Sequence, residues 1–173
     1  MVGAREVLVS DTTASGGAEE LAAAPLASLV DALFGKRVAM EGLLSSRGMV
    51  LSGKDCPEQA GRGEVAEATI RRLRRAVPAA VPGIVFLSGG QSDVAATERL
   101  NAICAVGDLP WTLSFSFGRA LQDAALKTWR GSAANAEDEQ AALHLRAKGN
   151  RPAPQGNQLR KRTKLKTLTA HTK

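Results

Sequence analysis

The chain has 173 residues and a net charge of +6, and its 44% hydrophobic residues include only four Phe, two Trp and no Tyr. No apolar run reaches the roughly 20 residues of a membrane span, and Met1 is not followed by the charged and apolar regions of a secretory signal. Cys56 and Cys104 have no close pairing or metal-ligand spacing, so we expect a cytoplasmic protein with reduced thiols and neither a metal nor another cofactor.

The basic charge is concentrated at the carboxyl terminus. Residues 146–173 hold nine of the 23 Lys and Arg and no acid, so residues 1–145 carry 14 basic against 17 acidic side chains. Beyond Asn150 the chain has no apolar period and contains the cluster Arg160-Lys161-Arg162. We therefore predict an ordered domain over residues 1–149 and a disordered basic tail over residues 150–173.

Short apolar runs alternate with segments of helical period, which is the pattern of β/α units around a parallel sheet. The first pair is a strand at residues 6–9 and a helix within residues 18–34, where Leu26, Val30 and Leu33 form an apolar stripe. Pro25 would cost about 3 kcal/mol inside this helix. We expect the helix to begin at Pro25 or to be split there.

The second strand is predicted at residues 38–44 and the second helix at residues 65–77, which Pro78 ends. The third strand is predicted at residues 83–88. The helix that follows has one apolar stripe, and Ser92 or Asp93 is available to cap its first turn.

In residues 111–117 aromatic and Leu residues alternate with Thr and Ser, which predicts a fourth strand with one apolar face. The last helix is signalled by charge. Asn135 is the expected cap, acids fill residues 137–139, Arg146 and Lys148 lie in the last turn, and Gly149 lies beyond its end. Four strand and helix pairs are therefore expected.

Two long runs are distinctive: residues 73–93 read LRRAVPAAVPGIVFLSGGQSD, and residues 110–122 read PWTLSFSFGRALQ. With them, over about residues 6–148, the chain resembles the class I fructose-bisphosphate aldolases. The resemblance implies an α/β fold that is part of a TIM (β/α)8 barrel, roughly its last four β/α units, because a whole barrel needs about 250 residues. It also implies the glycolytic Schiff-base cleavage of fructose 1,6-bisphosphate to dihydroxyacetone phosphate and glyceraldehyde 3-phosphate as the family's activity.

The resemblance implies a phosphate site. Ser88, Gly89, Gly118 and Arg119 match the residues that bind one phosphate of the family's substrate. A glycine turn exposes backbone N–H groups, a serine adds a hydroxyl donor, and an arginine supplies a charged fork. The alternative is a plain tight turn with a solvated Arg119. We favour an inherited phosphate site that takes a sugar phosphate.

The same alignment places Ser46 where the family carries its Schiff-base lysine, and Ala4 where it carries the glutamate that transfers protons. Glu6 is retained as the second carboxylate. Only a primary amine can form the iminium that accepts electrons as the carbon–carbon bond breaks. Lys36 and Lys54 lie in predicted loops, where we expect surface charges rather than substitute amines. We therefore predict that no catalytic set is intact and that the chain alone is inactive.

Two other functions compete with this one. A partial barrel exposes sheet edges and apolar strand faces, which favours a non-catalytic interaction protein that pairs with itself or with a full-length aldolase subunit. The basic tail could instead bind nucleic-acid phosphates. It has no interleaved aromatic residue, so we expect a solvated tail and no nucleic-acid or membrane partner. Truncation, a shifted reading frame and divergent duplication remain open as origins.

Overall fold

The computed structural model describes residues 15–150, which form an α/β arrangement around a three-stranded parallel sheet in the order β1-β2-β3. The strands are β1 (Leu44–Arg47), β2 (Gly83–Phe86) and β3 (Thr112–Phe115). The helices are α1 (Ser15–Gly35), α2 (Arg62–Ala76), α3 (Asp93–Ala105), α4 (Arg119–Trp129) and α5 (Ala136–Asn150), with short 3-10 turns η1 (Met40–Gly42) and η2 (Ala133–Asn135). Ala4, Glu6, the strand predicted at residues 6–9 and the basic tail lie outside the described residues.

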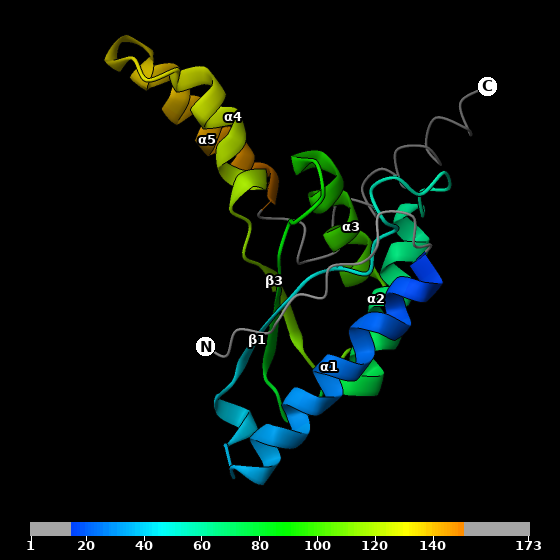
Figure 1. Cartoon of the computed structure of the whole chain (residues 1–173). Helices are drawn as coiled ribbons and strands as arrows, with labels where there is room; N and C mark the ends of the chain where they lie inside the picture. Colours follow the sequence, from blue (N-terminus) through cyan, green and yellow to red (C-terminus); the bar gives the residue numbers. More distant parts are fainter. Residues whose placement is uncertain (1–14, 151–173) are drawn as a thin grey trace, which may run out of the picture.

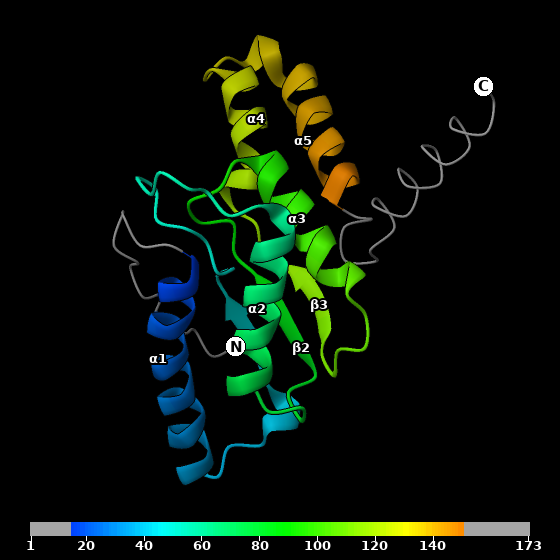
Figure 2. The ribbon, with the colours of Figure 1, turned by 90° about the vertical axis from the view of Figure 1, so that its right-hand side faces the viewer.

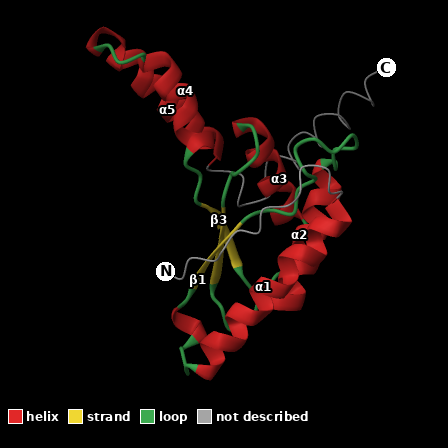
Figure 3. Cartoon of the chain, viewed as in Figure 1, coloured by secondary structure: helices red, strands yellow, loops and turns green. Residues whose placement is uncertain are grey.

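The helices divide into two groups. α2 and α3 cover one face of the sheet, and α1 packs along α2 (Figures 1 and 2). α4 and α5 form an antiparallel hairpin that contacts α3 at its base and extends from the end of β3 away from α1 and α2 (Figure 3). None of the described helices is long and apolar enough to cross a membrane.

The core lies between the sheet and the helices on its covered face. Ile84 and Phe86 on β2 are fully buried there, and Leu113 on β3 is in register with Ile84. Side chains alternate between the two faces of a strand. Leu44 and Thr112, on the opposite face, are exposed. The alternation predicted for residues 111–117 is confirmed, and buried Trp111 also donates its indole N–H to Pro78 O over 3.0 Å.

Local signals located two helix ends correctly. α2 ends at Ala76, two residues before Pro78, because a proline disfavours helical backbone in the residue before it. α3 begins at Asp93, and the Ser92 hydroxyl accepts the Ala95 N–H over 3.2 Å. Of the two residues predicted as the cap of α3, Ser92 therefore occupies the capping position.

Three predicted boundaries are wrong. α1 runs through Pro25 from Ser15 to Gly35, and burial of Leu26 in the core offsets the hydrogen bond that proline cannot donate. The second strand begins at Leu44, because the residues before it include the 3-10 turn η1. α5 continues through Gly149 to Asn150, which is completely buried.

Candidate functional site

Two turns meet at the carboxyl edge of the sheet. Ser88 follows β2, and its carbonyl accepts the Gln91 N–H over 3.2 Å to close a turn. Gly118 and Arg119 follow β3, and Arg119 is the first residue of α4. Because β2 and β3 pair in parallel, the two turns emerge from the same edge. The four residues matched to a phosphate site, Ser88, Gly89, Gly118 and Arg119, therefore follow neighbouring strands at one edge.

The glycine with left-handed backbone in the first turn is Gly90, with φ of 71°. Side chains other than glycine rarely adopt this conformation, because Cβ crowds the following carbonyl. Sequence reasoning singled out Gly89 and missed Gly90. An added Cβ would meet no atom within 4 Å at either Gly90 or Gly118, but Gly118 has a φ of −87°, which other residues can adopt.

A cavity of about 840 Å³ lies at this edge. Its lining comes from the loop after β1, from the turn between β2 and α3, from α3 and from one side of α4. Arg119 is the predicted site residue that lines it, together with Gly90 and Gln91 of the neighbouring turn. Gly89 and Gly118 each adjoin a lining residue in the chain, and neither they nor Ser88 line the cavity themselves. The cavity therefore includes only part of the expected phosphate corner.

The cavity carries an excess of positive charge. Among the described residues that line it, four are cationic and two are acidic. Both acids are already in ion pairs: Asp93 with Arg146 at 3.2 Å, and Asp123 with Lys127 at 2.6 Å. The remaining lining cations are Lys54, Arg99 and Arg119. This charge favours an anionic ligand.

Arg99 is a cavity residue that sequence reasoning missed. It lies on α3 and donates from Nη1 to Gln91 Oε1 over 3.0 Å. Burial lowers the pKa of the Arg99 guanidinium, and the neighbouring Glu98 partly opposes that shift. The sequence could have indicated that Arg99 lies on the same side of α3 as Ser92, because the two residues are seven apart. Residues seven apart share one face of a helix.

Ser46 lies in the middle of the β1 ladder, in register with Val85, and is partly buried. It points to the face opposite the buried Ser45 and Arg47. It does not line the cavity. Its hydroxyl stands where the resemblance places an amine, so this position can donate or accept a hydrogen bond but cannot form an iminium.

Arg47, the next residue, is 8% exposed and lies on the helix-covered face in register with Phe86. Burial, and then repulsion from Arg72, lower the pKa of the Arg47 guanidinium to about 10. Its Nε is buried without a hydrogen-bond partner among the described residues. Arg72 Nη2 donates to Gly48 O over 2.9 Å, which holds the second cation beside the first.

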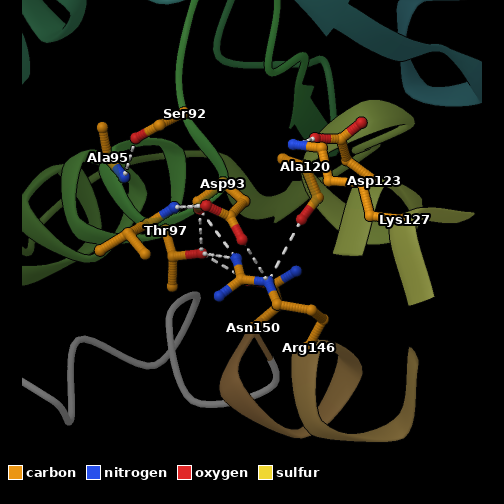
Figure 4. Close-up of polar contacts among 10 residues, drawn as sticks. Ser92, Asp93, Ala95, Thr97, Ala120, Asp123, Lys127, Arg146 and Asn150 are labelled. Carbon is orange, nitrogen blue, oxygen red and sulfur yellow. Dashed lines mark hydrogen bonds and ion pairs between the residues drawn. The ribbon is translucent and has the colours of Figure 1, made fainter. Parts of the chain in front are cut away.

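Arg146 ties α5 to the amino-terminal ends of α3 and α4, which follow the two turns of the candidate site (Figure 4). Besides its ion pair with Asp93, its guanidinium donates to Asp93 O over 2.8 Å and to Ala120 O over 3.4 Å. Thr97 also accepts from it, and the Thr97 hydroxyl hydrogen-bonds Asn150 Oδ1. The first turns of α3 and α4 are therefore held by one side chain of α5.

Asn135, predicted to cap α5, precedes the first residue of that helix and donates from Nδ2 to Trp129 O over 3.0 Å. Both cysteines are free thiols, Cys56 in a loop and Cys104 on α3. Among residues 15–150 no cluster of three or more His, Cys, Asp or Glu could hold a metal ion. Lys36 and Lys54 are exposed in turns, and Lys54 lines the cavity.

Comparison with known proteins gives consistent matches. A family model described as fructose-bisphosphate aldolase class-I matches residues 4–172. This match continues past residue 150, where the sequence analysis expected the resemblance to end. The chain is 49% identical over 132 residues to a probable class 1 aldolase of Xanthomonas axonopodis pv. citri, covering 76% of this chain and 40% of that protein. It is 53% identical over 132 residues to a cytoplasmic aldolase isozyme of Cicer arietinum, covering 76% and 36%.

A solved structure is also similar. The fructose-bisphosphate aldolase of Plasmodium falciparum superposes with a TM-score of 0.82 at 39% identity, covering 85% of this chain and 42% of that one. The chain thus spans less than half the length of each of these relatives. The arrangement of the sheet and helices is that of the corresponding part of the solved protein.

Proposed function

The chain belongs to the class I fructose-bisphosphate aldolase family, and from this premise we propose that it binds a sugar phosphate at the carboxyl edge of its sheet and forms no Schiff base at residue 46. Arg119 carries the proposal. It is the first residue of α4, it lines the cavity, and it follows the strand that neighbours the Ser88 turn.

The proposed binding uses groups that favour phosphate. The Arg119 guanidinium can donate two parallel hydrogen bonds to phosphate oxygens, and the amino-terminal end of α4 adds partial positive charge. The Ser88 hydroxyl and the backbone N–H groups near Gly90 are further donors. Phosphates commonly bind at this edge of barrel folds, after the last two strands.

The proposed lack of lyase activity follows from the chemistry of residue 46. Schiff-base cleavage begins when an uncharged amine attacks the substrate ketone and water leaves to form an iminium. Ser46 could add to a ketone only as a hemiketal, which supplies no cationic electron sink. We therefore propose that this chain, although its relatives are glycolytic aldolases, binds a sugar phosphate and does not cleave it through residue 46.

Binding is tested by calorimetric titration of the purified chain with fructose 1,6-bisphosphate at constant ionic strength. Arg119→Ala should weaken binding about 10- to 100-fold, because hydrogen bonds to a charged group contribute about 1.5–3 kcal/mol. Arg74→Ala is the matched control, since Arg74 is exposed in the last turn of α2 and does not line the cavity. Equal affinity of wild type and Arg119→Ala would overturn the proposed site.

Schiff-base formation is tested by borohydride reduction in the presence of dihydroxyacetone phosphate, followed by intact-mass measurement. The expected result is no mass increase, whereas a class I aldolase that carries the family's lysine should gain one reduced adduct. An adduct on this chain, mapped by peptide analysis to Lys54 or Lys36, would show that another amine has replaced the missing lysine.

A second candidate function, association with another copy or with an aldolase subunit, is favoured by apolar side chains on the α4 and α5 hairpin. Leu145 is 70% exposed, and Leu126 and Trp129 are also exposed. Sedimentation equilibrium would separate the candidates. A monomer at high concentration that also fails to bind added aldolase would remove this second function.

We further propose a cytoplasmic location. The supporting observation is the match to a cytoplasmic isozyme of Cicer arietinum. A chloroplastic aldolase of Chlamydomonas reinhardtii matches with similar identity, so the chloroplast is the alternative location. Microscopy of the tagged full chain distinguishes the two.

A further inference from the structure

We propose that Arg99 and Gln91 form a second oxyanion subsite in the carboxyl-edge cavity, separate from Arg119 and selective for phosphate chemistry. The inference rests on the proposed function only in assigning the cavity to anions. Its own evidence is a pair of side chains outside the four residues that were matched to the phosphate site.

The first observation is the environment of Arg99. Its guanidinium is partly buried, and its one hydrogen bond among the described residues goes to the neutral amide oxygen of Gln91. The neighbouring Glu98 carboxylate opposes the effect of burial only in part, because desolvation is the larger of the two effects on the Arg99 pKa. Burial lowers its pKa, so its charge is desolvated without full compensation. A bound anion would supply that compensation.

The second observation is the other half of the Gln91 amide. Because Oε1 accepts from Arg99, Nε2 points away from the guanidinium. Nε2 is buried and has no hydrogen-bond partner among the described residues. A buried amide donor without an acceptor destabilises the folded state. An oxyanion seated against Arg99 offers an acceptor to this group after a small shift of the side chain.

The third observation is the position of both residues in the cavity. Gln91 and Arg99 line it together with Arg119. Asp93 and Asp123, which also line it, are engaged by Arg146 and Lys127. Neither acid is therefore placed to neutralise Arg99. A purely structural link between the turn before α3 and the second turn of that helix would need only a neutral hydrogen-bond donor, so it gives no reason for a cation.

The phosphate at this subsite could be a free ion, or it could be a second phosphate of a ligand whose first phosphate contacts Arg119. Both have the same chemistry at Arg99, where a planar guanidinium can donate two hydrogen bonds to one oxyanion. The two sources differ in whether the Arg99 and Arg119 contacts belong to one molecule, and that difference can be measured.

The test is a titration of the purified chain with inorganic phosphate at constant ionic strength, monitored by the arginine side-chain Nε–H signals in ¹⁵N correlation spectra. The Arg99 signal should shift with saturation and should keep shifting in Arg119→Ala. The Arg74 signal is the internal control, since Arg74 is exposed and outside the cavity. If the Arg99 signal moves no more than that of Arg74, or stops responding in Arg119→Ala, the second subsite does not exist.

This design separates the two proposals. Saturation at Arg99 without response at Arg119 would retain the subsite and refute the phosphate corner, and the reverse would refute only the subsite. The wild-type titration needs no variant at Arg99, so it stays informative if Arg99→Gln fails to fold.

A second arm identifies the source of the phosphate. If one ligand bridges both subsites, fructose 1,6-bisphosphate should bind wild type about tenfold more tightly than fructose 6-phosphate, and Arg99→Gln should remove that preference. If Arg99 saturates with inorganic phosphate and the two sugars bind wild type equally, the subsite takes a free phosphate ion.

Discussion

Arg146 and Asp93 join the last helix to the edge of the sheet: Arg146 Nε lies 3.2 Å from Asp93 Oδ2. Arg146 is 17% exposed and Asp93 is 35% exposed, so the pair is partly shielded from water. Asp93 is the first residue of α3, directly after the cap of that helix, and it lines the carboxyl-edge cavity. The conformation of the candidate site therefore depends on a helix that contributes no residue to its lining.

Removing this link should destabilise the fold. Arg146→Ala is expected to lower the free energy of unfolding by about 2–3 kcal/mol, because it removes a partly buried ion pair and the hydrogen bonds to two backbone carbonyls. Arg146→Lys should recover part of this loss, since it keeps the charge but not the fork. Urea denaturation measures both.

Lys127→Ala is the control for Arg146→Ala. Its ion pair with Asp123 is solvent-exposed within one helix and should matter little to stability. If Arg146→Ala and Lys127→Ala unfold at the same urea concentration as wild type, the Arg146 link is structurally unimportant.

Replacing Arg47 with an apolar residue should stabilise the protein. Arg47 is buried beside Arg72, and Arg47→Leu is expected to raise the free energy of unfolding by roughly 1–3 kcal/mol, because a poorly compensated buried charge is removed. Arg74→Leu, at an exposed position of α2, is the control and should change stability little. A less stable Arg47→Leu would show that the guanidinium has a compensating contact.

The Arg47 effect should also depend on pH. Burial and then Arg72 lower its pKa to about 10 in the folded chain, well below that of an arginine in the unfolded chain, so above about pH 10 the unfolded state binds more protons. Stability from this group therefore rises with pH in that range. The advantage of Arg47→Leu over wild type should narrow between pH 9 and pH 11. A constant difference would contradict the lowered pKa.

The Cys104 thiol should be unreactive in the folded protein. Burial raises its pKa from 9.0 to about 12, so its thiolate fraction at pH 8 falls about a thousandfold below that of the unfolded chain. In a Cys56→Ala background, iodoacetamide should modify Cys104 at least 100-fold more slowly without urea than with it. Comparable rates would show that the thiol is accessible and ionises normally.

Two glycines should respond to alanine in opposite directions. Gly90→Ala should cost about 1–2 kcal/mol, because Gly90 has a φ of 71° that alanine adopts only with strain. Gly63→Ala should instead stabilise by about 0.5–1 kcal/mol, because Gly63 is helical in α2 and an added Cβ meets no atom within 4 Å. Thermal unfolding measures both. A neutral Gly90→Ala would mean that the turn relaxes to another conformation.

The sequence alone determined the family and most of the local structure. Alternation in residues 111–117 located β3, Pro78 located the end of α2, and Ser92 located the start of α3. These features depend on neighbours within a few residues, so local patterns suffice to predict them. The identity of residue 46 is likewise read directly, and with it the absence of an amine at that position.

Only the tertiary structure decided which distant groups meet. α1 tolerates Pro25 because Leu26 packs into the core, and α5 continues past Gly149 to Asn150, which hydrogen-bonds Thr97 on α3. Arg99 hydrogen-bonds Gln91, and both line one cavity with Arg119. These residues meet because α3 and α4 begin at the same edge of the sheet, after two paired parallel strands. Such contacts join residues whose separation in the chain carries no local signal, so packing rather than sequence periodicity determines them.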